Sequence, residues 1–330
     1  MTWKMAPALA CGNVCLIKPS EYSPLTSLRA AELWKDILPP GVLQVLLGKA
    51  ETAQQLVAHS GVHKVSLTGS TETGIKVAQE ASKDLKRLTL ELGGKSAMLV
   101  FEDYEDLDTA VRVAIEGNFI NNGQVCSNCT RVFVENGILQ EFLDRLVSKL
   151  KDSISIGNNL LEETNMGPLI SSNQYDRVMG FITRAMKDDG VELIHGGNGI
   201  NGKFVEPTVF LCHDDQAEVA KEEVFGPVMT VLPFDSEEEA VDRANHGTEY
   251  GLAAGLMTKD LERAHRISRR LEAGNIWVNN WNYSPVEMPF GPYKKSGYGK
   301  ELGEEAIENY SQIKTVYVEM GNVKDSPSFF

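Results

Sequence analysis

Over residues 13–92, short apolar runs alternate with amphipathic stretches. Short, nearly continuous apolar runs predict strands, and the first of them, "NVCLIK" at 13–18, has the character of a buried strand. Between them lie amphipathic stretches with helix-start and helix-stop signals, such as Pro24 at the beginning of one and Gly61 at the end of another. The predicted strands cover 13–18, 42–48, 63–69 and 87–92, and the predicted helices 23–38, 49–61 and 70–85. Such repetition predicts a parallel sheet covered by helices, about half of a doubly wound nucleotide-binding fold.

A second α/β stretch opens at Gly93. Its helices show apolar stripes at helical spacing, and its strands are short and apolar. The predicted helices cover 106–119, 138–154, 171–190, 236–247 and 260–274, and the strands include 130–135, 222–234 and 275–280. A Gly/Asn-rich hairpin is expected within 195–210, feeding a strand. The alternating tail at 313–321 predicts an exposed edge strand, which is a candidate contact between subunits.

Composition narrows the class of protein. The chain has 330 residues, enough for two domains, and a formal net charge of −14, so a polyanion such as nucleic acid is not an expected partner. No apolar run is long enough to span a bilayer, and the first residues do not resemble a signal peptide. Five cysteines are too few and too scattered for a disulfide scaffold, which predicts a reducing compartment.

The segment "NNGQVCSNCTR" at 121–131 places Cys126 and Cys129 three positions apart. A structural zinc site needs four ligands, and no second C-x-x-C is present, so we expect no metal. A thioredoxin-like redox pair belongs to a much smaller domain. Two alternatives remain open on the residues alone: one nucleophilic thiol in a loop that faces a cleft, or small buried thiols without chemistry.

Several blocks resemble the aldehyde dehydrogenase family. The segments at 88–99 and 121–135 resemble the paired signatures of that family, and those at 5–25, 65–74, 222–228 and 289–304 follow in the same order. Within the family, residues 279–291 and 310–321 look most like the branch that oxidises betaine aldehyde and 4-trimethylaminobutyraldehyde. The resemblance implies NAD-dependent oxidation of an aldehyde to the acid through a cysteine thiohemiacetal and thioester.

The resemblance assigns roles to four residues. Cys126 is expected to be the nucleophile, and Cys129 an inert neighbour. Glu91 is expected to activate the water that hydrolyses the thioester, which favours water over coenzyme A as acyl acceptor. It lies 35 positions before Cys126, one more than is common in the family. Lys4 and Glu301 match positions of a proton relay, although surface charge is an equal alternative.

Six further residues are expected to bind NAD by the same resemblance. A carboxylate at the adenosine ribose disfavours the 2′-phosphate of NADP, and a strand–Gly–helix junction suits a pyrophosphate. The set is Lys18 and Glu21 at the adenosine ribose, Gly69 and Ser70 at the pyrophosphate, and Glu223 and Phe225 at the nicotinamide ribose. For the substrate, an aromatic box around a quaternary ammonium is expected from Trp3, Trp281, Tyr283 and Phe290, with ordinary packing as the alternative.

The expected architecture is therefore α/β and aldehyde dehydrogenase-like. It comprises a partial Rossmann-type NAD domain at 1–93, a catalytic α/β domain at 94–295, a return to the NAD domain at 296–312, and an oligomerisation strand and tail at 313–330. We expect a homo-oligomer, a dimer or tetramer, in the cytoplasm, with a mitochondrial location left open. The family's upstream Pro-Trp-Asn block, which supplies an oxyanion-hole amide, is not in this sequence. A truncated chain is therefore expected, and the rival hypothesis is an inactive subunit or regulatory partner.

Overall fold

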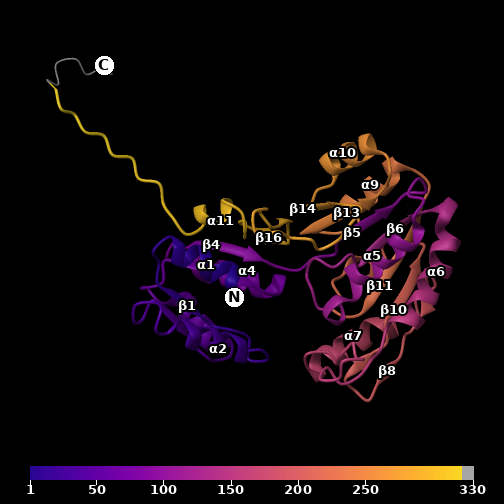
Figure 1. Ribbon diagram of the computed structural model, residues 1–330, viewed down its shortest axis with the longest axis horizontal. Helices are drawn as coiled ribbons and strands as arrows, with labels where there is room; N and C mark the ends of the chain where they lie inside the picture. The colour runs from indigo at the N-terminus through magenta and orange to yellow at the C-terminus, as the bar shows by residue number, and fades with distance from the viewer. Residues whose placement is uncertain (322–330) are drawn as a thin grey trace.

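A computed structural model describes residues 1–321 of the chain. Its elements form two lobes that lie side by side (Figure 1), a smaller one from the first and last parts of the sequence and a larger one from the middle. The elements of the smaller lobe are α1 (Thr2–Ala10), β1 (Cys15–Ile17), α2 (Leu25–Trp34), β2 (Leu43–Val45), α3 (Ala50–Ala58), β3 (Lys64–Thr68), α4 (Thr71–Ser82), β4 (Arg87–Glu91), β16 (Gly297–Tyr298) and α11 (Glu305–Glu308).

The larger lobe follows from residue 97. Its helices are α5 (Leu107–Phe119), η1 (Ile120–Gly123), η2 (Asn136–Ile138), α6 (Leu139–Ser153), α7 (Ser172–Ala185), α8 (Glu218–Lys221), α9 (Glu237–His246) and α10 (Leu261–Arg270). Its strands are β5 (Ala97–Val100), β6 (Arg131–Glu135), β7 (Val191–His195), β8 (Gly199–Ile200), β9 (Phe204–Val205), β10 (Thr208–Cys212), β11 (Val228–Phe234), β12 (Tyr250–Gly251), β13 (Ala253–Met257), β14 (Asn275–Val278) and β15 (Tyr293–Lys294). The predicted hairpin is confirmed, since β8 and β9 pair antiparallel before β10.

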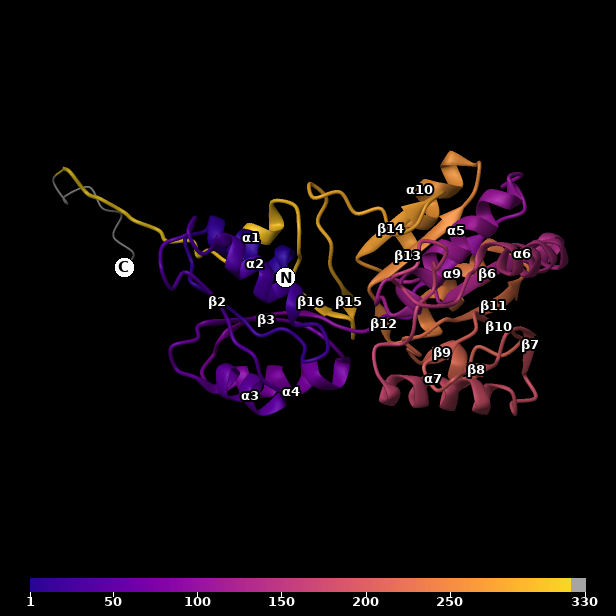
Figure 2. The ribbon, with the colours of Figure 1, turned by 60° about the horizontal axis from the view of Figure 1, so that its bottom comes forward.

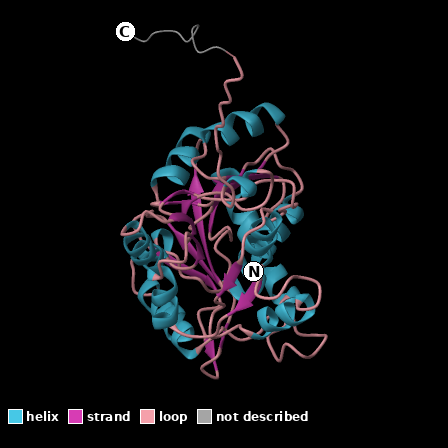
Figure 3. Ribbon diagram, turned by 90° about the vertical axis from the view of Figure 1, so that its left-hand side faces the viewer, coloured by secondary structure: helices cyan, strands magenta, loops and turns pink. Residues whose placement is uncertain are grey.

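A seven-stranded sheet forms the centre of the larger lobe, in the order β14-β13-β5-β6-β11-β10-β7. All its neighbours run parallel except β10 and β7. Figure 3 shows helices on both sides of the strands. Successive residues of a strand point to opposite faces, so Phe133 enters one apolar cluster with α7, α9 and α10, whereas Val132 and Val134 enter the other with α5 and α6. Burial on both faces explains why these strands are almost entirely apolar.

The smaller lobe holds a three-stranded sheet in the order β16-β4-β3. β3 and β4 run parallel, and β16 returns from the far end of the chain to pair antiparallel with β4. Gly297 lies opposite Glu91 in this ladder. Between the two lobes, β12 pairs antiparallel with β15 (Figure 2), so the chain crosses from one lobe to the other more than once.

One expectation about strands is wrong. β1 is not buried, since Leu16 is 45% exposed, and β1 and β2 form a separate two-stranded sheet that does not join β3. The segment 313–321, expected as an edge strand, pairs with no other strand of this chain within residues 1–321, and Ile313 is fully exposed. This segment runs away from the body of the molecule (Figure 1), and among residues 1–321 no strand pairs with its backbone N–H and C=O groups. The remainder of the predicted tail, 322–330, lies outside the described residues, and its role between subunits stays a prediction, as do the domain boundaries.

Among residues 1–321, every helix is too short or too polar to cross a lipid bilayer.

Candidate active site

Glu91 is the last residue of β4 and is buried, with 5% of its surface exposed. The strand is held on both sides at this point: the amide of Gly69 donates to the Glu91 carbonyl (3.0 Å), and that of Leu92 donates to the Ser296 carbonyl (2.8 Å). Neither carboxylate oxygen has a hydrogen-bond partner. Burial raises the pKa of Glu91 to about 8, Glu301 adds to the shift, and Lys4 and Lys300 oppose it. A carboxyl group with a pKa near neutrality is suited to general-base catalysis.

Cys126 lies in the loop between η1 and β6, and this loop is fixed by contacts to several elements. Gly123 has a φ of +72°, and a Cβ there would lie 2.0 Å from the Gly226 carbonyl oxygen, so only glycine fits. The Ser127 hydroxyl donates to the Asn282 amide oxygen (2.7 Å), and the Trp281 indole donates to the Ser127 carbonyl (2.9 Å). The thiol is thus presented from a rigid loop rather than a mobile one.

The Cys126 thiol is half-buried and is protonated at neutral pH. Burial and, to a smaller extent, the carboxylates of Glu223 and Glu91 raise its pKa to about 12. The backbone amides of Cys126 and Ser127 act in the opposite direction, because they approach the sulfur. Two carboxylates from distant parts of the sequence therefore act on one thiol. Cys126, Glu91 and Glu223 therefore lie close enough in the structure for their charges to interact.

Cys129 lies on a different side of the loop. Its side chain is fully buried in the cluster of α5 and α6, its sulfur lies 3.8 Å from the Ala114 carbonyl oxygen, and burial raises its pKa. Cys126 instead packs at the edge of a small cluster with Trp277 and Phe290. Both cysteines are free thiols. In the part of the chain that the structure describes, no three His, Cys, Asp or Glu side chains gather as ligands for a metal ion.

Lys4 and Glu301 form an ion pair beside Glu91, although they come from opposite ends of the sequence. The side chain of Glu301 is 4% exposed and that of Lys4 is 24% exposed. The Ser66 hydroxyl also donates to Glu301, at 3.5 Å. Glu301 is held by reciprocal backbone hydrogen bonds with Phe290, both 2.7 Å. The pair is therefore a buried part of the site rather than surface charge.

The four candidate aromatic residues do not form one box. Trp3 and Phe290 are neighbours with ring centroids 5.1 Å apart, whereas Trp281 pairs with Trp277 at 5.2 Å. Phe290, Trp277 and Trp281 lie in the same small cluster as Cys126. The side chain of Tyr283 is 72% exposed, and only its backbone carbonyl takes part, as the acceptor of the Trp277 indole (2.8 Å). The aromatic side chains in the cluster of Cys126 are thus Trp277 and Phe290, which are buried (8% and 6% exposed), and the partly buried Trp281, with Trp3 against Phe290.

The residues expected at the cofactor lie along the smaller lobe and at the junction of the lobes. Lys18 follows β1 and donates to the Pro19 carbonyl (2.9 Å), and Glu21 is exposed beyond it. Gly69 and Ser70 are exposed at the start of α4, where the Ser70 hydroxyl accepts from the Thr73 amide (3.2 Å). The first amides of a helix favour an anion.

Glu223 and Phe225 belong to the other side of this region, in the larger lobe. One Glu223 oxygen accepts from the Gly94 amide (3.1 Å), and burial raises the pKa of this carboxyl group. Phe225 adopts a φ of 57°, and its carbonyl accepts from the Gln174 amide (2.8 Å). The exposed helix start suits the phosphates of a dinucleotide, and the carboxylates of Glu21 and Glu223 suit its ribose hydroxyls.

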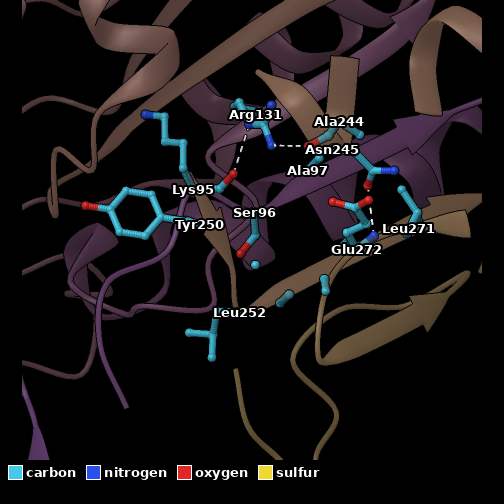
Figure 4. Close-up of a pocket in the computed structure, with 14 residues that line it drawn as sticks. Lys95, Ser96, Ala97, Arg131, Ala244, Asn245, Tyr250, Leu252, Leu271 and Glu272 are labelled. Atoms are coloured by element: carbon cyan, nitrogen blue, oxygen red, sulfur yellow. Dashed lines mark hydrogen bonds between the residues drawn. The ribbon is translucent and has the colours of Figure 1, made fainter. Parts of the chain in front are cut away.

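A small cavity of about 10 Å³ lies beside β5, with Lys95, Ser96 and Arg131 among its lining residues (Figure 4). It has room for about one water molecule and contains neither Cys126 nor Glu91. Arg131 donates to the Lys95 carbonyl (2.9 Å). The Lys95 ammonium nitrogen is buried without a hydrogen-bond partner, and burial lowers its pKa to about 7. This cavity is therefore not a substrate site.

Three residues of the site were not predicted from the sequence. The sequence predicts Trp277 only as part of a buried strand, and Asn282 lies in the block 279–291 without a role of its own. Lys300 donates to the Gly291 carbonyl (3.1 Å), lies 5.2 Å from the centre of the Tyr293 ring, and acts on Glu91. The sequence places Lys300 next to Glu301, which is the one feature that could have indicated a role. The orientation of the Lys300 side chain depends on contacts with segments that are distant in sequence.

The chain is similar to members of one known protein family over nearly its whole length. A model of the "Aldehyde dehydrogenase family" matches residues 1–316. A betaine aldehyde dehydrogenase of Mesorhizobium japonicum is 50% identical over 97% of this chain and 66% of its own length. A human 4-trimethylaminobutyraldehyde dehydrogenase is 48% identical over 98% of this chain and 67% of its own length. The chain thus spans about two thirds of the length of these relatives.

Solved structures show the same fold. An NAD-dependent aldehyde dehydrogenase from Sinorhizobium meliloti superposes with a TM-score of 0.95 at 37% identity, covering 100% of this chain and 65% of the other. An NAD⁺ complex of an aldehyde dehydrogenase from Bacillus cereus superposes with a TM-score of 0.93 at 40% identity, covering 97% and 65%. The expected α/β architecture is confirmed.

Proposed function

The chain belongs to the aldehyde dehydrogenase family, and we propose that it oxidises an aldehyde to the carboxylic acid with NAD, through covalent intermediates on Cys126. The single observation that carries the proposal is the convergence of Glu91 and Glu223 on the Cys126 thiol, whose pKa both carboxylates raise. A sulfur nucleophile, a buried carboxyl group with a pKa of about 8 and backbone amides at the sulfur are the parts that acyl chemistry requires.

The first half of the reaction uses the thiol. The Cys126 sulfur bonds to the carbonyl carbon, its proton passes to a base, and the carbonyl oxygen becomes an oxyanion that the amides of Cys126 and Ser127 can stabilise. A bound NAD would supply the hydride acceptor, and once the thiohemiacetal carbon has lost its hydride, the acyl group remains on Cys126 as a thioester. Lys18, Glu21, Gly69, Ser70, Glu223 and Phe225 would hold the cofactor.

The second half uses Glu91. The carboxylate takes a proton from water, the hydroxide oxygen bonds to the thioester carbon, and the carbon–sulfur bond breaks to release the acid and the thiolate. Lys4 and Glu301 would pass the proton away from Glu91; the ion pair between them, and the effect of both charges on Glu91, support this role. The comparisons give no support to the rival hypothesis of an inactive subunit.

The proposed substrate class is a trimethylammonium aldehyde. Trp277, Trp281 and Phe290 provide aromatic faces in the cluster that contains Cys126, and such faces attract a quaternary ammonium by cation–π interaction. The names of the two relatives described above point to the same class of substrate.

The test is NADH formation by the purified chain from betaine aldehyde, 4-trimethylaminobutyraldehyde and hexanal. We expect turnover with a higher kcat/KM for the two ammonium aldehydes. A clear preference for hexanal would remove the substrate assignment, and failure with every aldehyde would remove the proposed activity. Glu91→Gln should still give one turnover of NADH but accumulate a Cys126 thioester, because hydrolysis loses its base and slows by about 10²–10⁴-fold. Mass spectrometry of the intact protein measures that adduct.

A further inference from the structure

The buried carboxyl group of Glu91 has no hydrogen-bond donor of its own, and the charges that face it come from three parts of the chain. Lys4 approaches from α1, Glu301 and Lys300 approach from the segment after β16, and the Cys126 thiol faces it across the site. Lys4 is already bound to Glu301, so its charge is largely neutralised. Lys300 is the cation of this group that forms no ion pair with a carboxylate in the described part of the chain.

The Lys300 side chain is held by a backbone carbonyl and an aromatic ring. Its ammonium group donates to the Gly291 carbonyl (3.1 Å) and lies 5.2 Å from the centre of the Tyr293 ring. Both partners are neutral, so they orient the charge without cancelling it. The aromatic face adds a cation–π attraction.

Two glycines make room for this side chain. A Cβ on Gly291 would lie 2.7 Å from the Lys300 Cδ and 3.2 Å from a Glu91 carboxylate oxygen, so the lysine stem and the carboxylate lie against the same residue. A Cβ on Gly274 would lie 3.0 Å from the Lys300 nitrogen. A Cβ at Gly274 would first meet the Gly291 carbonyl oxygen (1.7 Å), which accepts from Lys300, and a Cβ at Gly291 would first meet the Gly299 carbonyl oxygen (2.6 Å).

We propose that Lys300 is a positioning residue for Glu91, holding beside the carboxylate a positive charge that forms no ion pair within residues 1–321, so that the carboxylate is ionised when it takes a proton from water. This inference rests on the proposed function for its catalytic meaning. The step itself is balanced without a further reactant: the proton of water goes to Glu91, and the hydroxide oxygen goes to the thioester carbon.

The direction of the effect follows from the charges. A cation favours the ionised carboxylate and lowers its pKa, so loss of Lys300 raises the pKa of Glu91 above its value of about 8. At any pH below this raised pKa, a smaller fraction of Glu91 is then ionised and able to act as the base. Burial lowers the pKa of Lys300, and Glu91 and Glu305 raise it, so Lys300 and Glu91 each favour the charged form of the other.

The experiment compares the wild-type chain with Lys300→Gln, Lys300→Arg and Lys295→Gln. Glutamine keeps a donor for the Gly291 carbonyl but removes the charge, and arginine keeps the charge. Lys295 is the matched control, because it is an exposed lysine five residues away that pairs with Glu249. The readout is the titration of the Glu91 carboxyl carbon by NMR with labelled glutamate, assigned through Glu91→Gln, which needs no catalytic activity.

We expect the Glu91 midpoint to rise by about one pH unit in Lys300→Gln, equivalent to a tenfold change in its ionisation constant, and to stay near the wild-type value in the other two. In an active chain, the pKa on the acidic side of the pH–rate profile of thioester hydrolysis should rise by the same amount. An unchanged midpoint in Lys300→Gln, or an equal shift in Lys295→Gln, overturns the proposal.

Two further results separate the possible failures. A shifted midpoint in a chain that oxidises no aldehyde retains the electrostatic inference and removes the proposed function. If Lys300→Gln does not fold, the reciprocal measurement needs no substitution at residue 300: Glu91→Gln should lower the pKa of the Lys300 ammonium group, because the coupling is mutual. An unchanged Lys300 titration would then overturn the proposal.

Discussion

Cys126 and Cys129 are separated by two residues but pack into different apolar clusters. The first lies at the edge of the cluster of Trp277 and Phe290, and the second is fully buried against α5. The sequence spacing therefore does not make them a chemical pair, because the loop turns one thiol to the site and the other into the core.

The two cysteines should respond differently to replacement by alanine. We expect Cys126→Ala to abolish NADH formation, because the reaction loses its nucleophile, and to leave the free energy of unfolding nearly unchanged. Cys129→Ala should keep turnover and lose about 1 kcal/mol of stability, since it leaves a small cavity in the core. Steady-state kinetics and urea unfolding measure the two effects. Loss of turnover in a folded Cys129→Ala protein would contradict the assignment.

Alkylation of Cys126 should be slow at neutral pH and should accelerate with pH, because only the thiolate reacts and the pKa of Cys126 is about 12. Glu223→Gln should raise the rate at fixed pH by about two- to tenfold, since removal of a nearby negative charge lowers that pKa. Glu222→Gln is the matched control, because Glu222 is exposed next to it. Iodoacetamide labelling, with the site identified by peptide mass spectrometry, checks the order of rates. Equal rates in the two variants would show that Glu223 does not act on the thiol.

Lys95→Met should stabilise the protein at neutral pH. The pKa of Lys95 is about 7 in the folded chain, against an ordinary value of ~10.4. Between these pH values the unfolded chain binds the proton and the folded chain does not, so the free energy of unfolding of the wild type rises with pH over this range. Below about pH 7, where Lys95 is protonated in both states, the full destabilisation from burying its charge is present.

The methionine variant should lack this rise and be more stable by about 1–3 kcal/mol at pH 7, because it removes a buried donor without a partner. Lys259→Met, at a lysine whose side chain is 53% exposed, is the control and should keep the wild-type slope. Guanidinium unfolding at several pH values measures both. A Lys95→Met protein with the wild-type slope would refute the assignment.

Gly94→Ala should disturb the site, because a Cβ there would lie 2.2 Å from the Cys126 carbonyl oxygen. We expect a loss of about 1–3 kcal/mol in the free energy of unfolding and a changed rate of Cys126 alkylation. Gly69→Ala is the matched comparison, since its Cβ would meet only Leu67, at an ordinary 3.7 Å, and should cost less than about 1 kcal/mol. Thermal unfolding of both variants provides the test, and equal losses would argue against the close contact at Gly94.

Local pattern was sufficient for most of the secondary structure. The strand that ends at Glu91 and the helix that begins after Ser70 follow from periodicity and from a serine that caps the helix. The exposure of Leu16 and the unpaired segment at Ile313 did not follow, because burial of an apolar strand depends on which surface covers it. Apolar sequence alone does not say what that surface is.

The site was predictable where its residues lie in short recognisable blocks, and not where it depends on distant contacts. Cys126 and Glu91 belong to such blocks. The role of Trp277 and the orientation of the Lys300 side chain depend on distant segments. These segments are brought together by the pairing of β12 with β15 and of β16 with β4. Tyr283 shows the reverse case: its aromatic character suggested a substrate contact, but its side chain lies in solvent.

The pairing of Gly297 with Glu91 also bears on how the protein is made. Protein domains generally fold from the N-terminal end during synthesis, and the strand that flanks Glu91, together with Lys300 and Glu301, is translated about 170 residues after Cys126. A nascent chain that ends before this region holds the thiol loop but not the groups that surround the carboxylate. The surroundings of Glu91 would therefore be completed only after this later segment has been made, and products of translation that stop before it would carry the cysteine without its complete partner set.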